Sequence, residues 1–519
     1  MILFFFFTVL LPTIFANEPV VVHTQYGDIL GYQTNLSRVF YGIPFAQPPV
    51  GPLRWEAPVP VVRWAPKMVN ATQPPSACPQ PPVPQSKRLV RYANPQIMSE
   101  DCLYLNIFTP LSSNLLSTNP LPVMIFIPGG DFQFNSASAS AYESEHLVNN
   151  TNIIIALIQH RLGVLGFLAT GNGPNDIKGN YGILDQRLAI AWVKQNIDAF
   201  GGDPNQITLF GQSSGAQSTA LHYVTKEMQS YFQRAIIQSA PMNFPFKTYL
   251  ENVPTVVLLA EQLHCSPNDF ACFRARSADE IITAQNQVNQ KLTSLDLLLL
   301  LEPWLPVIDN DIVHGTLIST IRNVSFPLKP LIIGSLTDEC YYMIYGALKK
   351  NVTVIEYMAM GVGLFGEKAL KILEHYPPLP SGDQRPNIAK IATEWIFTCS
   401  TRVFARKAAT YSYVFGYPDN TLNSLNCKDH ACHADELPYI FQSFWDRFTD
   451  VGRYISHGMA TYWTNYAKSE NPNEPSSVPV SWPKYTSGNE TYMYIQNPFQ
   501  VGQSYVKSDC DLWDEIGYK

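Results

Sequence analysis

Charged residues are scarce in this chain of 519 residues, in which Asp, Glu, Lys and Arg together make up only 15%. The formal net charge is -7, and no basic stripe runs through the sequence. Proteins that bind nucleic acid gather Lys and Arg on one face, so we expect no nucleic-acid partner. The hydrophobic content of 46% excludes a disordered or fibrous chain and predicts a large globular core.

Long apolar runs are missing beyond the first residues of the chain. The longest leucine run, 297–301, breaks at Glu302-Pro303 and falls far short of the ~20 apolar residues of a membrane span. Residues 1–16 are apolar, end on Ala16 and are followed by Asn17-Glu18. They are too short to cross a bilayer and predict a secretory signal peptide, although its positive n-region is missing; a short buried segment is the alternative.

Cofactor motifs, repeats and linkers are also absent from the sequence. It has neither the ligand spacing of a metal site nor a glycine-rich phosphate loop, so we expect no cofactor and no metal. We expect residues 17–519 to fold as a single domain. The polar end, 514–519, carries no anchor or retention signal, which predicts a secreted protein, extracellular or held in a secretory-pathway vesicle. The sequence leaves the oligomeric state open.

Two features that the chain does have are typical of exported proteins. Nine cysteines, an odd number, indicate four disulfides and one free thiol. Asn-x-Ser/Thr sequons predict glycosylation at six positions: Asn35, Asn70, Asn149, Asn323, Asn351 and Asn489.

A Gly-x-Ser-x-Gly motif, residues 211–215, stands at the centre of the functional argument. It follows the apolar run 207–210 and precedes the helical stretch 216–221, so it predicts a strand, a tight corner and a helix. This is the setting of a nucleophile elbow, in which the two glycines let the backbone turn sharply. Ser213 would then be an exposed hydroxyl at a helix N-terminus, where backbone N–H groups favour developing negative charge.

Six longer strings of residues extend the argument beyond this motif: 41–55, 99–108, 179–189, 199–205, 462–468 and 481–485. With them, the chain resembles the type-B carboxylesterase and cholinesterase family of α/β-hydrolases nearly from end to end. The resemblance implies an α/β fold with a central, mostly parallel sheet flanked by helices and an active site down a gorge. Buried apolar runs such as 123–127 and 153–158, alternating with helical stretches such as 185–196, independently indicate these layers.

The partners of Ser213 follow in the chain order serine, acid, histidine that this fold uses. The family pattern places the acid at Glu339, just after the strand-like run 331–334, and Asp338 is the rival by chemistry. The family's histidine segment places the base at His433, with His430 three residues upstream as the alternative. With Glu339 holding its Nδ1–H, His433 would take the Ser213 proton and pass it to the leaving alcohol.

The oxyanion hole is where the chain departs most from the family. The resemblance implies the backbone N–H groups of Gly130, Asp131 and Ser214 as donors, but Asp131 replaces the last of three family glycines. Its N–H survives, whereas a carboxylate beside the oxyanion would oppose it; losing one donor costs roughly 3 kcal/mol. Either Asp131 turns away and leaves an ordinary esterase, or it points in, slows ester hydrolysis or orients water against an acylated or phosphorylated serine.

The resemblance also implies three disulfides, which join Cys78 to Cys102, Cys265 to Cys272 and Cys399 to Cys510. Cys427 and Cys432 remain close together in the chain, and we predict that they pair and hold the loop before His433. Cys340 would then be the unpaired thiol beside Glu339.

The expected activity is that of a secreted serine carboxylic-ester hydrolase that forms an acyl-enzyme with a small-molecule ester. Gln212 stands where cholinesterases have a glutamate, and the loop from Cys78 to Cys102 holds Tyr92 but no tryptophan, which disfavours a dedicated acetylcholinesterase. The stretch 297–304 suits an acyl pocket or ordinary core packing equally well. Asp131 and a His-to-Pro change at Pro128 keep open the alternative of a relative with weak or no activity that serves in adhesion, storage or structure.

Overall fold

The computed structural model describes residues 18–82, 97–112, 119–292, 303–418 and 427–518. The predicted signal peptide, Tyr92 and the leucine run 297–301 lie outside these residues.

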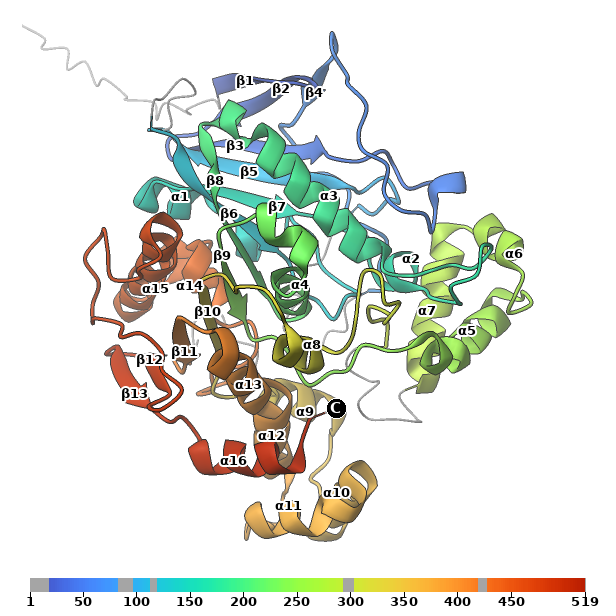
Figure 1. Ribbon diagram of the computed structural model, residues 1–519, viewed down its shortest axis with the longest axis vertical. Coiled ribbons are helices and arrows are strands. Elements are labelled where there is room, and N and C mark those ends of the chain that lie inside the picture. Colours follow the sequence, from blue (N-terminus) through green and yellow to red (C-terminus); the bar gives the residue numbers. More distant parts are fainter. Residues whose placement is uncertain (1–17, 83–96, 113–118, 293–302, 419–426, 519) are drawn as a thin grey trace, which may run out of the picture.

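Thirteen strands of the described chain form one twisted sheet that runs through the centre of the molecule (Figure 1). They are β1 (Glu18–Thr24), β2 (Gly27–Gln33), β3 (Ser37–Pro44), β4 (Met68–Asn70), β5 (Tyr104–Pro110), β6 (Leu121–Ile127), β7 (Ile154–Ile158), β8 (Gly202–Gln212), β9 (Arg234–Gln238), β10 (Leu331–Leu336), β11 (Tyr411–Phe415), β12 (Thr491–Ile495) and β13 (Gln500–Gln503). The order across the sheet is β1-β2-β3-β5-β7-β6-β8-β9-β10-β11-β12-β13, and β4 pairs with β2.

The middle of the sheet is parallel and its two edges are antiparallel. From β7 through β6, β8, β9, β10 and β11 to β12, each neighbouring pair runs in the same direction. The carboxyl ends of these strands therefore meet at one edge of the sheet, where ligands bind in open α/β sheets. This arrangement confirms the predicted α/β class.

Helices cover both faces of the sheet, as the buried strand runs predict. The helices are α1 (Glu145–Thr151), α2 (Gly163–Phe167), α3 (Tyr181–Asn196), α4 (Ser214–Tyr223), α5 (Tyr249–Leu263), α6 (Phe270–Ala275), α7 (Ala278–Leu292), α8 (Leu317–Asn323), α9 (Tyr341–Ala347), α10 (Val354–Phe365), α11 (Ala369–His375), α12 (Arg385–Ala392), α13 (Cys399–Ala408), α14 (Leu437–Phe441), α15 (Asp450–Ser469) and α16 (Lys507–Ile516).

The alternation of side chains along β6 separates two hydrophobic cores. Val123 and Ile125 face a core that includes α3, α4 and α5, whereas Met124 and Phe126 face a core that includes α1, α14 and α15. Successive residues of a strand point to opposite faces, so a fully apolar strand such as β6 supplies both cores.

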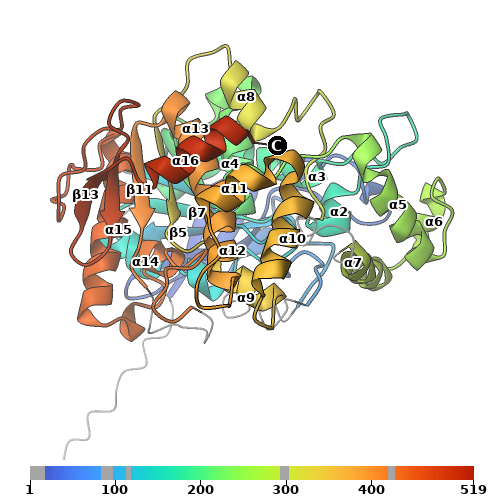
Figure 2. The same ribbon diagram turned by 90° about the horizontal axis from the view of Figure 1, so that it is seen from below.

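A third, smaller apolar cluster lies outside the sheet. It joins α9 to α12 with α16, and Figures 1 and 2 show these helices grouped at one end of the molecule. The Cys399–Cys510 disulfide ties α13 to α16 beside this cluster. The other three disulfides are Cys78–Cys102, Cys265–Cys272 and Cys427–Cys432, and Cys340 is a free, buried cysteine.

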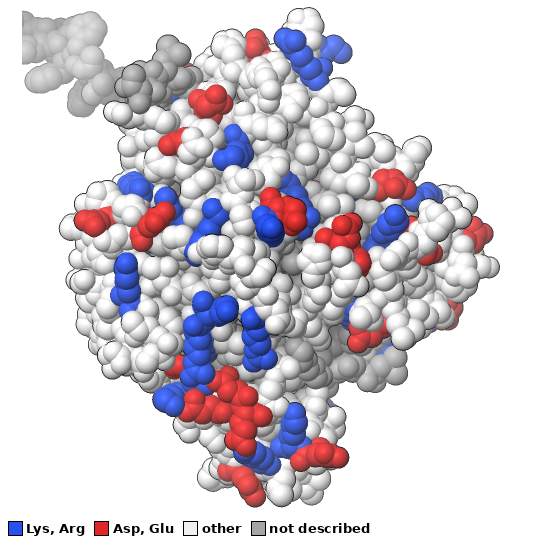
Figure 3. Space-filling model, in the orientation of Figure 1, with Lys and Arg blue, Asp and Glu red and all other residues white. Residues whose placement is uncertain are grey.

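The surface carries charges of both signs without a broad field of either on the face shown in Figure 3. The densest cluster lies where α13 meets α16, and there Arg402 and Arg406 pair with Asp511 and Asp514. The side chains of all six sequon asparagines are exposed. A search of the described helices found none that is long and apolar enough to cross a membrane.

Candidate active site

Ser213 lies in the corner between β8 and α4, at the carboxyl edge of the parallel strands. Its φ and ψ are 59° and -129°, a conformation that costs a non-glycine residue energy and occurs mostly at functional sites. The motif predicts that its glycines make the sharp turn, but the strained backbone conformation belongs to Ser213 itself. The glycines serve close approach instead, because a Cβ on Gly215 would collide with the carbonyl oxygen of Ile127, at the end of β6.

Glu339 and His433 form a buried pair near this corner. Glu339 follows β10 by three residues, and its Oε1 accepts a hydrogen bond from the N–H of Leu336 at 2.8 Å. Its Oε2 lies 2.5 Å from Nδ1 of His433. The side chains are 0% and 3% exposed, and the Phe397 ring packs 5.0 Å from the imidazole, so this contact is shielded from water. The pair joins the residues that the sequence named as acid and base.

The loop that carries His433 is fixed by the segment that carries Glu339. Asp338 forms a parallel bridge with Cys432, and the N–H of Asp338 donates to the carbonyl of Ala431 at 3.1 Å. The Cys427–Cys432 disulfide closes the loop, and Asp435 accepts a hydrogen bond from the N–H of Cys432 at 2.9 Å. These contacts bring two chain segments about ninety residues apart into register.

The two rival residues pair with each other instead of with the triad. His430 Nδ1 lies 3.0 Å from Asp338 Oδ1, and the His430 ring stacks on Tyr341 with ring centroids 3.7 Å apart. Their side chains are 33% and 31% exposed. They line a cavity of about 340 Å³ whose other walls include α12 and residues 393–398, and none of Ser213, Glu339 and His433 lines it.

The base nitrogen of His433 contacts Gln212 in this structure. Nε2 of His433 lies 3.2 Å from the side-chain amide nitrogen of Gln212. Among the hydrogen bonds of the described residues, none joins the Ser213 hydroxyl to His433. The three predicted residues therefore gather at the same corner, while the serine and the histidine have not yet formed the hydrogen bond of proton transfer.

The loop of the candidate oxyanion hole has an unusual backbone. Gly130, Asp131 and Phe132 all have positive φ, of 126°, 56° and 56°. The Ser214 hydroxyl accepts a hydrogen bond from the N–H of Phe132 at 3.1 Å, which ties the loop to the start of α4. Asp131 is half-buried, and burial followed by the charge of Asp131 raises the pKa of Tyr342.

Two residues that the sequence analysis did not name hold this loop in place. The Gln80 side chain donates to the carbonyl of Asn135 at 2.9 Å and accepts from its N–H at 2.7 Å. The Asn135 side chain donates to the carbonyl of Gly129 at 3.1 Å. Isolated amide residues such as these give no signal in the sequence.

Burial raises the pKa of two other ionisable groups near the acid. Burial and then the nearby Glu339 raise the pKa of Glu436 well above its usual range, and Gln238 donates to its Oε1 at 3.2 Å. Burial and then Glu339 also raise the pKa of the Cys340 thiol, which disfavours the reactive thiolate. Both shifts favour the uncharged forms of groups that lie close to the charge of Glu339.

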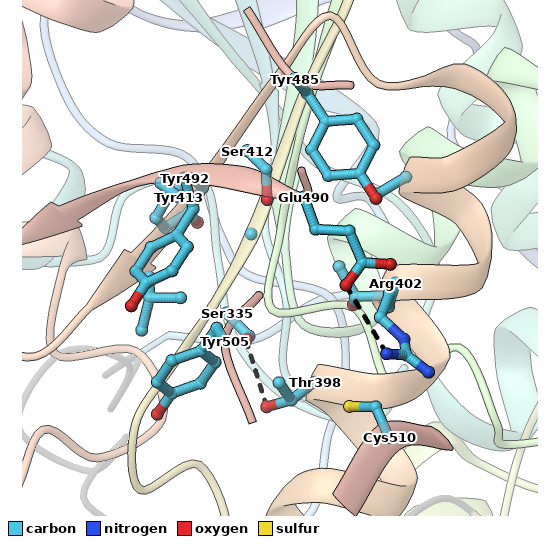
Figure 4. Close-up of a pocket in the computed structure, with 14 residues that line it drawn as sticks. Ser335, Thr398, Arg402, Ser412, Tyr413, Tyr485, Glu490, Tyr492, Tyr505 and Cys510 are labelled. Carbon is cyan, nitrogen blue, oxygen red and sulfur yellow. Dashed lines mark hydrogen bonds and ion pairs between the residues drawn. The ribbon is translucent and has the colours of Figure 1, made fainter. Parts of the chain in front are cut away.

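A separate polar cavity of about 50 Å³ lies beneath α13 (Figure 4). Arg402 pairs with Glu490 on one side of it at 3.6 Å, and the Ser335 and Thr398 hydroxyls lie 3.3 Å apart on another. None of Ser213, Glu339 and His433 lines this cavity. Its volume suits a few water molecules, so it is distinct from the candidate active site.

Comparisons with known proteins agree with this fold. The model of the carboxylesterase family matches residues 18–513, and this chain belongs to that family.

Relatives in this family carry several names. The chain is 33% identical over 512 residues to the cAMP-regulated D2 protein of Dictyostelium discoideum, covering 96% of this chain and 93% of the relative. It is 32% identical to the Crystal protein of the same organism, covering 95% and 90%, and 29% identical to an acetylcholinesterase of Bungarus fasciatus, covering 95% and 86%. A solved thermophilic pNB esterase superposes with a TM-score of 0.82 at 27% identity, covering 95% of this chain and 99% of that chain, which confirms the α/β-hydrolase fold.

Proposed function

We propose that this protein is a serine carboxylic-ester hydrolase with Ser213 as nucleophile, His433 as base and Glu339 as the acid that orients it. The buried contact of 2.5 Å between Glu339 and His433 carries the proposal. A carboxylate on Nδ1 keeps the proton there, so Nε2 retains the lone pair that a general base needs. The strained corner that presents Ser213, together with the family, supports the same assignment.

The reaction follows from these positions. His433 takes the Ser213 proton as the hydroxyl attacks the ester carbonyl, and Glu339 stabilises the imidazolium that forms. The backbone N–H groups of Gly130, Asp131 and Ser214 stabilise the oxyanion. His433 then gives the proton to the leaving alcohol, and water attacks the acyl-enzyme with His433 again as base.

The substrate we propose is a small-molecule ester, and not acetylcholine in particular. Gln212 contributes no charge at the position where the resemblance expects a glutamate, so an attraction for a cationic substrate is missing. The name of the acetylcholinesterase relative therefore describes that relative and is not transferred to this chain.

We also propose that the protein is exported, with residues 1–16 as a signal peptide and residues 17–519 as one domain. Four disulfides are typical of oxidising compartments, and six exposed sequon asparagines are accessible to glycosylation.

The second candidate function is that this protein has kept the family's fold and has lost the activity. Three observations favour it. The hydroxyl of Ser213 is not hydrogen-bonded to His433 in this structure, and a relative with 32% identity bears the name Crystal protein. The third is Asp131 in the oxyanion loop.

Hydrolysis of a series of p-nitrophenyl esters by the wild type, Ser213→Ala and Ser218→Ala separates the two candidates. Ser218 is the matched control, since it is a buried serine on α4 whose hydroxyl donates to the carbonyl of Ser214. We expect a loss on the order of a million-fold in kcat for Ser213→Ala and retained activity for Ser218→Ala. Activity that survives in Ser213→Ala would overturn the assignment, and a folded but inert wild type would favour the inactive relative.

A further inference from the structure

The side-chain amide of Gln212 contacts Nε2 of His433, the nitrogen that has to accept the Ser213 proton in the proposed reaction. Its side chain is 1% exposed and its amide nitrogen lies 3.2 Å from Nε2 of His433. The residue immediately before the nucleophile thus contacts the base, while the nucleophile itself does not. Neither the sequence motif nor the family match assigns a role to this amide.

The proton positions on His433 decide which group donates in this contact. Glu339 Oε2 at 2.5 Å from Nδ1 keeps the imidazole proton on Nδ1, which leaves Nε2 as an acceptor. The amide –NH₂ of Gln212 can donate to that lone pair, whereas its carbonyl oxygen cannot. The hydrogen bond therefore stabilises the neutral imidazole, because an imidazolium has a proton on Nε2 and accepts no bond there.

The room for the Gln212 side chain comes from the oxyanion loop. A Cβ on Gly129 would lie 3.1 Å from Oε1 of Gln212 and 2.8 Å from Cβ of Ser213. The missing side chain at Gly129 lets the amide lie between the loop and the imidazole. The contact is thus a packed feature of the site.

We propose that Gln212 is a positioning residue that holds Nε2 of His433 in the resting protein and yields it to the Ser213 hydroxyl when the ester enters. This inference rests on the proposed function, since it assigns Gln212 a role in the same site. It has two consequences: Gln212 favours the neutral, proton-accepting form of His433, and displacing its hydrogen bond is part of every catalytic cycle.

Other ionisable groups also surround His433, and the test has to leave them unchanged. Glu339 faces Nδ1, and Phe397 covers the ring. The remaining titratable groups of the neighbouring segments are Asp131, Cys340, Tyr342, Tyr413, Asp435 and Glu436. His430 and Asp338 lie on the same two segments but face the other side.

The test compares how kcat/KM depends on pH in the wild type, Gln212→Met and Gln212→Glu. The acid limb of this pH profile, where kcat/KM rises with pH, is the part to compare. Methionine keeps the length of the side chain and removes the donor, so the limb should move to higher pH by a few tenths of a unit. A carboxylate at this position favours the imidazolium and should move the limb up by about one unit. Above the limb, Gln212→Met should react with a fluorophosphonate about threefold faster, because no hydrogen bond has to be displaced.

Gln217→Met is the matched control. Gln217 is a buried glutamine on α4 whose amide donates to the carbonyl of Pro241 at 3.2 Å, so it shares the packing of Gln212 without the contact to His433. Its acid limb should coincide with that of the wild type. Limbs that coincide in all four proteins, or that move to lower pH in the Gln212 variants, would overturn the inference.

A readout without turnover separates this inference from the proposed function. The proton shared by His433 Nδ1 and Glu339 gives a low-field proton NMR signal, and its pH titration reports the pKa of His433 in any folded variant. If the wild type hydrolyses no ester, the proposed function fails, yet the order Gln212→Glu above Gln212→Met above wild type in that titration still supports the positioning role. An unchanged titration overturns it whether or not the protein is active.

Discussion

Two histidine–carboxylate pairs are formed by the same two segments of this chain. The inner pair, His433 with Glu339, is buried and has a contact of 2.5 Å. The outer pair, His430 with Asp338, has a contact of 3.0 Å, is about one-third exposed and faces a cavity of about 340 Å³. The residue types are nearly the same, so burial and proximity to Ser213 distinguish them.

The difference shows how pairing between two chain segments can bury one residue and leave its neighbour partly exposed. Asp338 and Glu339 are consecutive, and the bridge between Asp338 and Cys432 lies at the boundary. Low local dielectric strengthens the charge contact of the inner pair, whereas solvent screens the outer pair. The following predictions test whether catalysis belongs to the inner pair alone.

The largest expected effect separates the two acids directly. Glu339→Gln should lower kcat on the order of ten-thousand-fold, because the amide no longer keeps His433 in the correct tautomer or stabilises its imidazolium. Asp338→Asn should change kcat less than about threefold, since a partly exposed ion pair contributes little. Steady-state kinetics with an aryl ester measures both, and comparable losses in the two variants would refute the division.

Asp131 brings a carboxylate to the loop of the candidate oxyanion hole, where the family has a glycine. Asp131→Gly should raise kcat for a simple aryl ester about tenfold, because a carboxylate near the oxyanion opposes its charge. Asp131→Asn keeps Cβ and removes the charge, so a similar rise in both variants assigns the effect to charge. A turnover number unchanged in both would show that the side chain has no part in the pocket.

The Cys427–Cys432 disulfide holds the loop shared by the two pairs. Replacing both cysteines with serine should lower the free energy of unfolding by about 2 kcal/mol, since the closed loop is short. Activity should fall several-fold as His433 loses its register. Urea denaturation and kcat/KM measure the two effects. If neither the unfolding free energy nor the activity changed, the disulfide would not be what holds the loop.

The outer cavity should influence stability and not turnover. Glu394 lines it, is only 4% exposed and has a pKa raised to about 7 by burial. The folded state therefore binds this proton more tightly than the unfolded state, so this group's contribution to stability is present below about pH 4.5 and is lost as the pH rises to about 7.

Glu394→Gln should remove the loss of stability that the Glu394 carboxyl causes as the pH rises. Relative to the wild type, the variant should gain about 3 kcal/mol in unfolding free energy between pH 4.5 and pH 8, with kcat unchanged. Urea midpoints at the two pH values provide the measurement. A difference between variant and wild type that is the same at both values would contradict the raised pKa.

The motif at residues 211–215 and the order of serine, acid and histidine were accessible from the sequence because each lies in a short, recognisable string. The resemblance to the family implied the mostly parallel sheet, apolar runs such as 123–127 agreed with its layers, and the structure confirmed it. The sequence also left two acids and two histidines open, since residue type alone cannot tell which of Asp338 and Glu339 is buried.

The contacts of single amides were out of reach for sequence reasoning. Gln80 supports the oxyanion loop from a segment about fifty residues away, and Gln212 contacts a histidine more than two hundred residues later. The motif also predicts that the glycines make the turn, whereas the positive φ belongs to Ser213 and the glycines permit close packing. Such details depend on which distant backbones meet.

The most direct test is to react the intact protein with a serine-directed fluorophosphonate and to identify the modified peptide by mass spectrometry. The account predicts one adduct, on Ser213, that forms in the wild type and in Asp338→Asn but is slowed on the order of a thousand-fold in Glu339→Gln. Labelling at another serine, or equal rates in the two acid variants, would contradict it.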